Sequence, residues 1–79
     1  MIDDVTRDVA ADISRYLIAH PAAADTVEGV HLVWVDQDVH PVSLDITLAA
    51  LELLLEQGVV ACVPIGGRLL WRARGAAAD

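Results

Sequence analysis

The side chains best suited to bind a metal ion in this chain are three histidines and one cysteine, namely His20, His31, His40 and Cys62. Zinc sites commonly take pairs of ligands from one helix turn or from a Cys-x-x-Cys knuckle, because such spacings make the side chains converge. None of the intervals here has that spacing. The sequence therefore predicts no metal site and no cofactor.

Catalytic chemistry is also poorly supported. Cys62 lies among apolar residues and is expected to be a buried small hydrophobe, whereas a nucleophilic thiol needs a nearby base and a lowered pKa. Asp36 and Asp38 are typical of an acidic turn. The pair Gly66-Gly67 lacks the helix and the lysine that follow a phosphate-binding loop. We therefore expect a protein that is not an enzyme.

The 79-residue chain has a formal charge of −7 and contains no lysine. This charge disfavours nucleic acid and anionic membranes as partners, because both attract basic proteins. A single cysteine excludes an internal disulfide, and no stretch approaches the roughly 18 apolar residues of a membrane span. We expect a cytoplasmic protein with no membrane partner, and the use of arginine in place of lysine is typical of a bacterial genome rich in GC.

An apolar fraction of 56% exceeds what the core of one small domain can bury. The surplus predicts at least one apolar patch on the surface.

The first predicted helix begins after Asp3 or Asp4, either of which can cap it. Apolar residues from Val5 to Leu17 recur at helical spacing. Pro21 ends this helix, because the residue before a proline, His20, is pushed out of helical geometry.

A second helix is predicted from Thr26 to Val35, with Asp25 and Glu28 forming a capping box. Gly29 within it costs about 1 kcal/mol relative to alanine, which predicts close packing against a neighbour there. A strand over residues 30–35 is the alternative, because the stretch is rich in β-branched side chains.

The third predicted helix follows Ser43 as N-cap and stops at Gly58. Its core-facing stripe, flanked by Thr47 and Leu54, is expected to be Leu44, Leu48, Leu51 and Leu55. A β-hairpin follows, with strands over residues 59–65 and 68–74 joined by Gly66-Gly67. Trp71 is expected to point inward and the arginines outward.

This order of elements resembles winged helix-turn-helix domains, most of all in the stretch Ala49–Val60 and in the hairpin that ends at Leu70-Trp71-Arg72. The segment His20–Val30 also resembles small bacterial proteins of this shape. The resemblance implies an α+β, winged helix-like domain over residues 1–74, with three helices followed by a C-terminal two-stranded β-hairpin. Residues 75–79 are expected to form a disordered tail.

Winged helices that read DNA usually present Arg, Lys, Asn or Gln from the third helix. The third helix here presents Asp45, Glu52 and Glu56 instead. Arginines occur near it only in the hairpin, at Arg68, Arg72 and Arg74. A DNA-binding regulator that uses these three arginines is therefore the alternative function.

The favoured function is a non-catalytic protein–protein interaction module, either a homodimer or a small adaptor or regulatory subunit with a protein partner. Its expected interface is an apolar patch on the second and third helices, formed by Leu32, Val33, Val35, Ile46, Ala50 and Leu53. The other possibility is that the core uses all of these residues.

Overall fold

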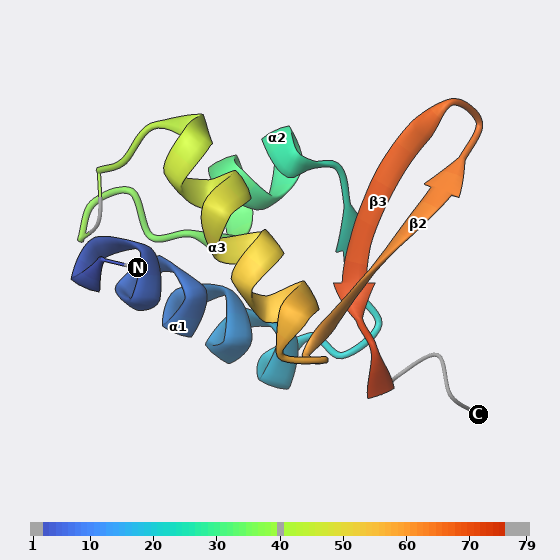
Figure 1. Ribbon diagram of the computed structural model, residues 1–79, viewed down its shortest axis with the longest axis horizontal. Helices are drawn as coiled ribbons and strands as arrows, with labels where there is room; N and C mark the ends of the chain where they lie inside the picture. Colours follow the sequence, from blue (N-terminus) through green and yellow to red (C-terminus); the bar gives the residue numbers. More distant parts are fainter. Residues whose placement is uncertain (1–2, 40, 76–79) are drawn as a thin grey trace.

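Three helical segments lie together, and a β-hairpin projects from one end of them in the computed structural model (Figure 1). The structure describes residues 3–39 and 41–75. The fold is α+β, as predicted, but its antiparallel sheet has three strands in the order β1-β3-β2. The prediction of a two-stranded hairpin therefore lacks one strand, β1.

Helix α1 spans Asp4–Ala19. Asp3 is its N-cap, and the Asp3 Oδ1 atom accepts a hydrogen bond of 2.8 Å from the backbone amide of Thr6. The helix ends at His20, whose backbone amide donates to the carbonyl of Tyr16. Both predicted ends of the first helix are confirmed.

The second helical segment consists of α2 (Val27–Gly29) and a π-helical turn, η1 (Val30–Trp34). The predicted helix is thus correct up to Trp34, Val35 is extended, and the strand alternative for residues 30–35 is wrong. The predicted capping box is wrong, because Thr26 is the N-cap and accepts from the amide of Gly29 at 3.3 Å. Asp25 belongs instead to strand β1 (Ala24–Asp25).

Helix α3 spans Leu44–Glu56, and its buried face is shifted from the predicted one. Leu51, Thr47 and Leu54 are buried as predicted, but the other three leucines of the stripe are not. Leu44, Leu48 and Leu55 are 36%, 37% and 41% exposed. The buried face is Thr47, Ala50, Leu51 and Leu54. Apolar residues surround nearly the whole helix, so spacing could not decide between the faces. The small side chains of Thr47 and Ala50 lie on the buried side, where α1 packs against α3.

Strands β2 (Val60–Ile65) and β3 (Arg68–Ala73) form the hairpin. Gly66 and Gly67 have φ values of +58° and +78°, which confirms their role in the turn. Trp71 is buried, as predicted for its face of β3.

The core joins α1, η1, α3 and the base of the hairpin. Its buried apolar residues are Val9, Ala10, Ile13, Leu17, Val30, Trp34, Val35, Ala50, Leu51, Leu54, Val60 and Trp71. None of the helices in the described part of the chain is long and apolar enough to cross a membrane. Of the expected disordered tail, residues 76–79 lie outside the described residues.

Candidate functional site

Strand β1 covers only part of the edge of β3. It pairs with β3 through Ala24 opposite Arg72 and Asp25 opposite Trp71. The chain then leaves the sheet, because Thr26 caps the helical segment that begins with α2. On the turn side of this pairing, residues Arg68–Leu70 of β3 pair with β2 and have no strand on their other side in the described structure.

A groove of about 700 Å³ lies where the line of β1 would continue. We call it the α2–β3 groove, and its lining residues are Thr26, Val27, Glu28, Leu48, Arg68, Leu69 and Trp71. One wall comes from the start of the second helical segment, one from β3, and Leu48 comes from α3. Its volume falls within the range of about 300–1,000 Å³ that is usual for binding pockets.

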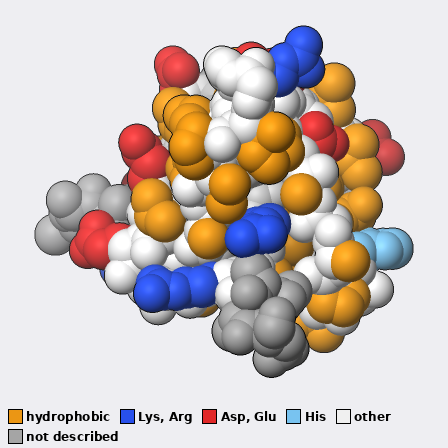
Figure 2. Space-filling view, turned by 90° about the vertical axis from the view of Figure 1, so that its right-hand side faces the viewer, with side chains coloured by type: hydrophobic (Ala, Val, Ile, Leu, Met, Phe, Trp, Pro, Cys, Tyr) orange, Lys and Arg blue, Asp and Glu red, His pale blue; other side chains and the backbone are white. Residues whose placement is uncertain are grey.

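The walls of the α2–β3 groove are mainly apolar, and they are open to solvent. Leu48 is 37% exposed and Leu69 is 57% exposed, although both are large aliphatic side chains. Glu28 and Arg68 are the charged residues of the lining, and both are exposed. Figure 2 shows hydrophobic side chains gathered over the hairpin end of the molecule. The basic and acidic side chains of the described residues are dispersed between them and do not form one charged patch on this face.

The predicted interface patch is not a continuous surface. Leu32 and Val33 are 73% and 57% exposed, but Val35 and Ala50 are buried in the core. Ile46 and Leu53 are half-buried and pack against that core. Val35 turns inward because the chain becomes extended there, and Ala50 lies on the buried face of α3, against which α1 packs. These two residues are therefore removed from the candidate interface.

The three hairpin arginines occupy different environments. Arg68 is exposed beside the turn, and Arg74 is exposed just after β3. Arg72 is half-buried, between Ala24 of β1 and Ala61 of β2 in the sheet register, and its Nε atom is buried with no hydrogen-bond partner among the described residues. Arg68 and Arg72 lie on the face of β3 opposite to Trp71, as their alternation predicts.

A polar cluster joins η1 to α3. The Nδ1 atom of His31 lies 2.7 Å from the Oγ1 atom of Thr47, which is fully buried. Gln37 Nε2 donates to the His31 carbonyl at 2.9 Å, and Gln37 Oε1 accepts from the amide of Val42 at 3.3 Å. His31 is half-buried in η1, and this cluster accounts for its polar contacts.

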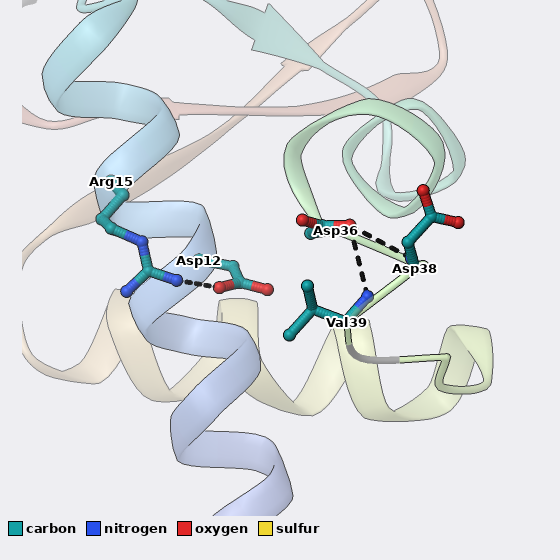
Figure 3. A network of polar contacts seen from close by, with 5 residues as sticks. All are labelled: Asp12, Arg15, Asp36, Asp38 and Val39. Atoms are coloured by element: carbon teal, nitrogen blue, oxygen red, sulfur yellow. Dashed lines mark hydrogen bonds and ion pairs between the residues drawn. The ribbon is translucent and has the colours of Figure 1, made fainter.

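Other polar side chains have structural partners. Asp36 accepts hydrogen bonds from the backbone amides of Asp38 and Val39 at 3.1 and 3.3 Å, and Asp12 forms an ion pair with Arg15 (Figure 3). Cys62 is half-buried opposite Trp71 in the sheet.

Within residues 3–39 and 41–75, no three His, Cys, Asp or Glu side chains come together as a metal site would require. His40, one of the four residues considered for zinc, lies outside the described residues.

Comparisons of this chain with protein-family models, with curated proteins and with solved structures give no match.

The sequence does not reveal the residues of the α2–β3 groove, for two reasons. Leu48 belongs to the longest leucine stripe of α3, and the spacing of that stripe predicts a position in the core. Val27 and Leu69 become neighbours of one groove only because β1 pairs with β3 and brings the start of α2 to that edge. The available signal was the surplus of leucines around α3, which is larger than one buried face can hold.

Proposed function

We propose that this chain is a winged helix-like protein–protein interaction module, and that the α2–β3 groove is its binding surface. Three helical segments before a C-terminal hairpin support the winged helix-like description. β1 adds a third strand to the hairpin that this description implies. In place of the predicted patch on the second and third helices, the interface consists of the side chains that line the groove.

The observation that carries the proposal is the exposure of Leu48 and Leu69 across one open groove. Exposed aliphatic residues are ordinary when they are scattered, but here they share a concave surface with Val27 and Trp71. A polypeptide bound there would remove this apolar area from water, which contributes about 25 cal/mol per Å² before the costs of association.

The charge distribution favours a polypeptide over a duplex. The exposed residues of α3 include Asp45, Glu52 and Glu56, and these carboxylates would repel phosphates. The alternative of DNA binding through Arg68, Arg72 and Arg74 has less support, because Arg72 is half-buried and none of the three belongs to α3.

Two matched variants test the proposal. Leu48→Asp places a charge in the groove, whereas Leu55→Asp places the same charge on the same helix at a leucine of similar exposure outside the groove lining. The immobilised wild-type chain and both variants are incubated with an extract of the source cell, and retained proteins are quantified by mass spectrometry. We expect a partner protein that the wild type and Leu55→Asp retain and that Leu48→Asp does not. When purified, that partner should bind the wild type and Leu55→Asp with similar affinity and Leu48→Asp much more weakly.

Light scattering on the three proteins tests whether the partner is a second copy. A dimer that Leu48→Asp converts to monomer would identify self-association through the groove. If neither a copy of this chain nor any other protein distinguishes Leu48→Asp from Leu55→Asp, the groove is not the binding surface. Micromolar binding of a DNA duplex with a steep salt dependence would favour the arginine-based alternative.

A further inference from the structure

We infer that the α2–β3 groove receives an extended polypeptide segment, which adds as a strand to the open edge of β3 at Arg68–Leu70. This inference rests on the proposed function and names the conformation and chemistry of the partner. It follows from the strand register, from the free edge and from the groove lining.

The register shows a position beside β3 where a strand could pair and where the described structure has none. If β1 continued beyond Asp25 in the same register, Thr26 would lie opposite Leu70, Val27 opposite Leu69 and Glu28 opposite Arg68. The chain instead turns into α2, so these residues line one wall of the groove and β3 lines the other. The space between the walls therefore lies along a strand edge, in line with an existing strand.

An uncovered strand edge offers backbone amides and carbonyls in the pattern that another strand can pair with. Over Arg68–Leu70, β3 is paired on the β2 side only. The outer edge of β2 is the competing edge, but it includes Pro64, which cannot donate a backbone hydrogen bond. The open part of β3 has no proline and is the edge that the groove follows.

The side chains of the groove indicate what the added segment carries. Successive residues of a strand point to opposite faces of a sheet, so every second residue of the segment faces Leu48, Leu69 and Trp71. These residues should be apolar. Glu28 and Arg68 lie opposite each other in the continued register, so neither fixes a charge at one position of the segment, and the formal charge of −7 on the chain favours a segment that is basic overall.

The test begins with a displayed library of random linear peptides, selected on the full wild-type chain with Leu48→Asp as the counter-selection. The best sequence is then synthesised and titrated by calorimetry against the wild type, Leu48→Asp, Leu69→Asp and the control Leu55→Asp. Leu69 is more exposed than Leu48, so Leu69→Asp is a second groove variant with little effect on folding. We expect apolar residues at alternate positions of the peptide, and affinity that both groove variants lose and the control retains.

Methylation of single backbone nitrogens in the peptide separates strand addition from other modes. Methyl groups at alternate positions, on the amides that face β3, should weaken binding by about tenfold or more, because each removes a hydrogen bond and blocks the edge. Methyl groups on the amides between them should leave affinity nearly unchanged. Amide hydrogen exchange of Leu69 should slow in the complex, because its amide faces the open edge, whereas the amides of Arg68 and Leu70 already face β2.

The results separate the inference from the proposed function. A peptide that needs Leu48 but has apolar residues at helical spacing, with no alternation in the methylation series, would overturn strand addition and leave the groove as the binding surface. A library that yields no peptide able to distinguish the wild type from Leu48→Asp would overturn strand addition. The proposed function would fall only if the extract and light-scattering experiments also failed to distinguish Leu48→Asp from Leu55→Asp.

Discussion

His31 Nδ1 and Thr47 Oγ1 lie 2.7 Å apart and connect η1 to α3 within the interior of the protein. Thr47 is fully buried, so its hydroxyl has given up its contact with water in exchange for this hydrogen bond. The pair is therefore a polar contact in an interface between helices that is otherwise mainly aliphatic.

The free energy of unfolding should show coupling between these two residues. Thr47→Val keeps the shape of the side chain and removes the hydroxyl, so we expect a loss of about 1 kcal/mol. In the background of His31→Ala, the same substitution should cost about 0.5–1.5 kcal/mol less. Urea unfolding of the two single variants and the double variant measures the coupling, and additive losses would contradict the contact.

The two faces of α3 should respond differently to truncation. Leu51 is completely buried, and Leu51→Ala should lower the free energy of unfolding by about 2–5 kcal/mol. Leu55 is 41% exposed, so Leu55→Ala should cost far less, about 1 kcal/mol or below. Chemical denaturation of both variants compares the faces, and equal losses would restore the leucine stripe predicted from the sequence.

Gly29 is expected to show a background-dependent effect. A Cβ atom on Gly29 would overlap the carboxylate of Asp25, which accepts a hydrogen bond of 2.8 Å from the Thr26 amide. In Gly29→Ala, the gain in helix propensity of about 1 kcal/mol is offset by displacement of that carboxylate. In the background of Asp25→Ala, the gain should appear in full. Thermal unfolding of the four proteins tests this, and the same effect of Gly29→Ala in both backgrounds would exclude the overlap.

The N-cap of α1 should make stability depend on pH. Hydrogen bonds from the backbone amide of Thr6, and then from its side chain, lower the pKa of Asp3 below its ordinary value of 3.8. Because the pKa is lower in the folded state, the contribution of Asp3 is present above pH 3.8 and is lost as the pH falls through the folded-state pKa.

Asp3→Asn keeps an oxygen that can cap the helix but does not titrate. We expect the wild type to be more stable than Asp3→Asn at neutral pH, and the difference to shrink on acidification below the ordinary pKa. Denaturation of both proteins at neutral pH and again below pH 3.8 measures this difference in the free energy of unfolding. A difference that stays constant with pH would show that the Asp3 carboxylate does not act as inferred.

The local features of this fold could be predicted from the sequence, because they depend on residues close together in the chain. The cap and the end of α1 follow from Asp3 and Pro21, and the hairpin turn follows from Gly66-Gly67. The close packing predicted at Gly29 is confirmed by the neighbouring Asp25 carboxylate. Each rests on a steric or hydrogen-bonding preference of a few consecutive residues.

The tertiary structure decided which of several apolar faces is buried. Helix α3 has leucines on nearly every side, and only packing against α1 places Leu51 and Leu54 inside and leaves Leu48 outside. The pairing of β1 with β3 joins residues far apart in the sequence, so no local sequence pattern predicts this pairing. The α2–β3 groove depends on both the packing of α3 and the pairing of β1. The apolar fraction of the sequence predicts an exposed apolar surface, and only the packing of helices and strands determines where that surface lies.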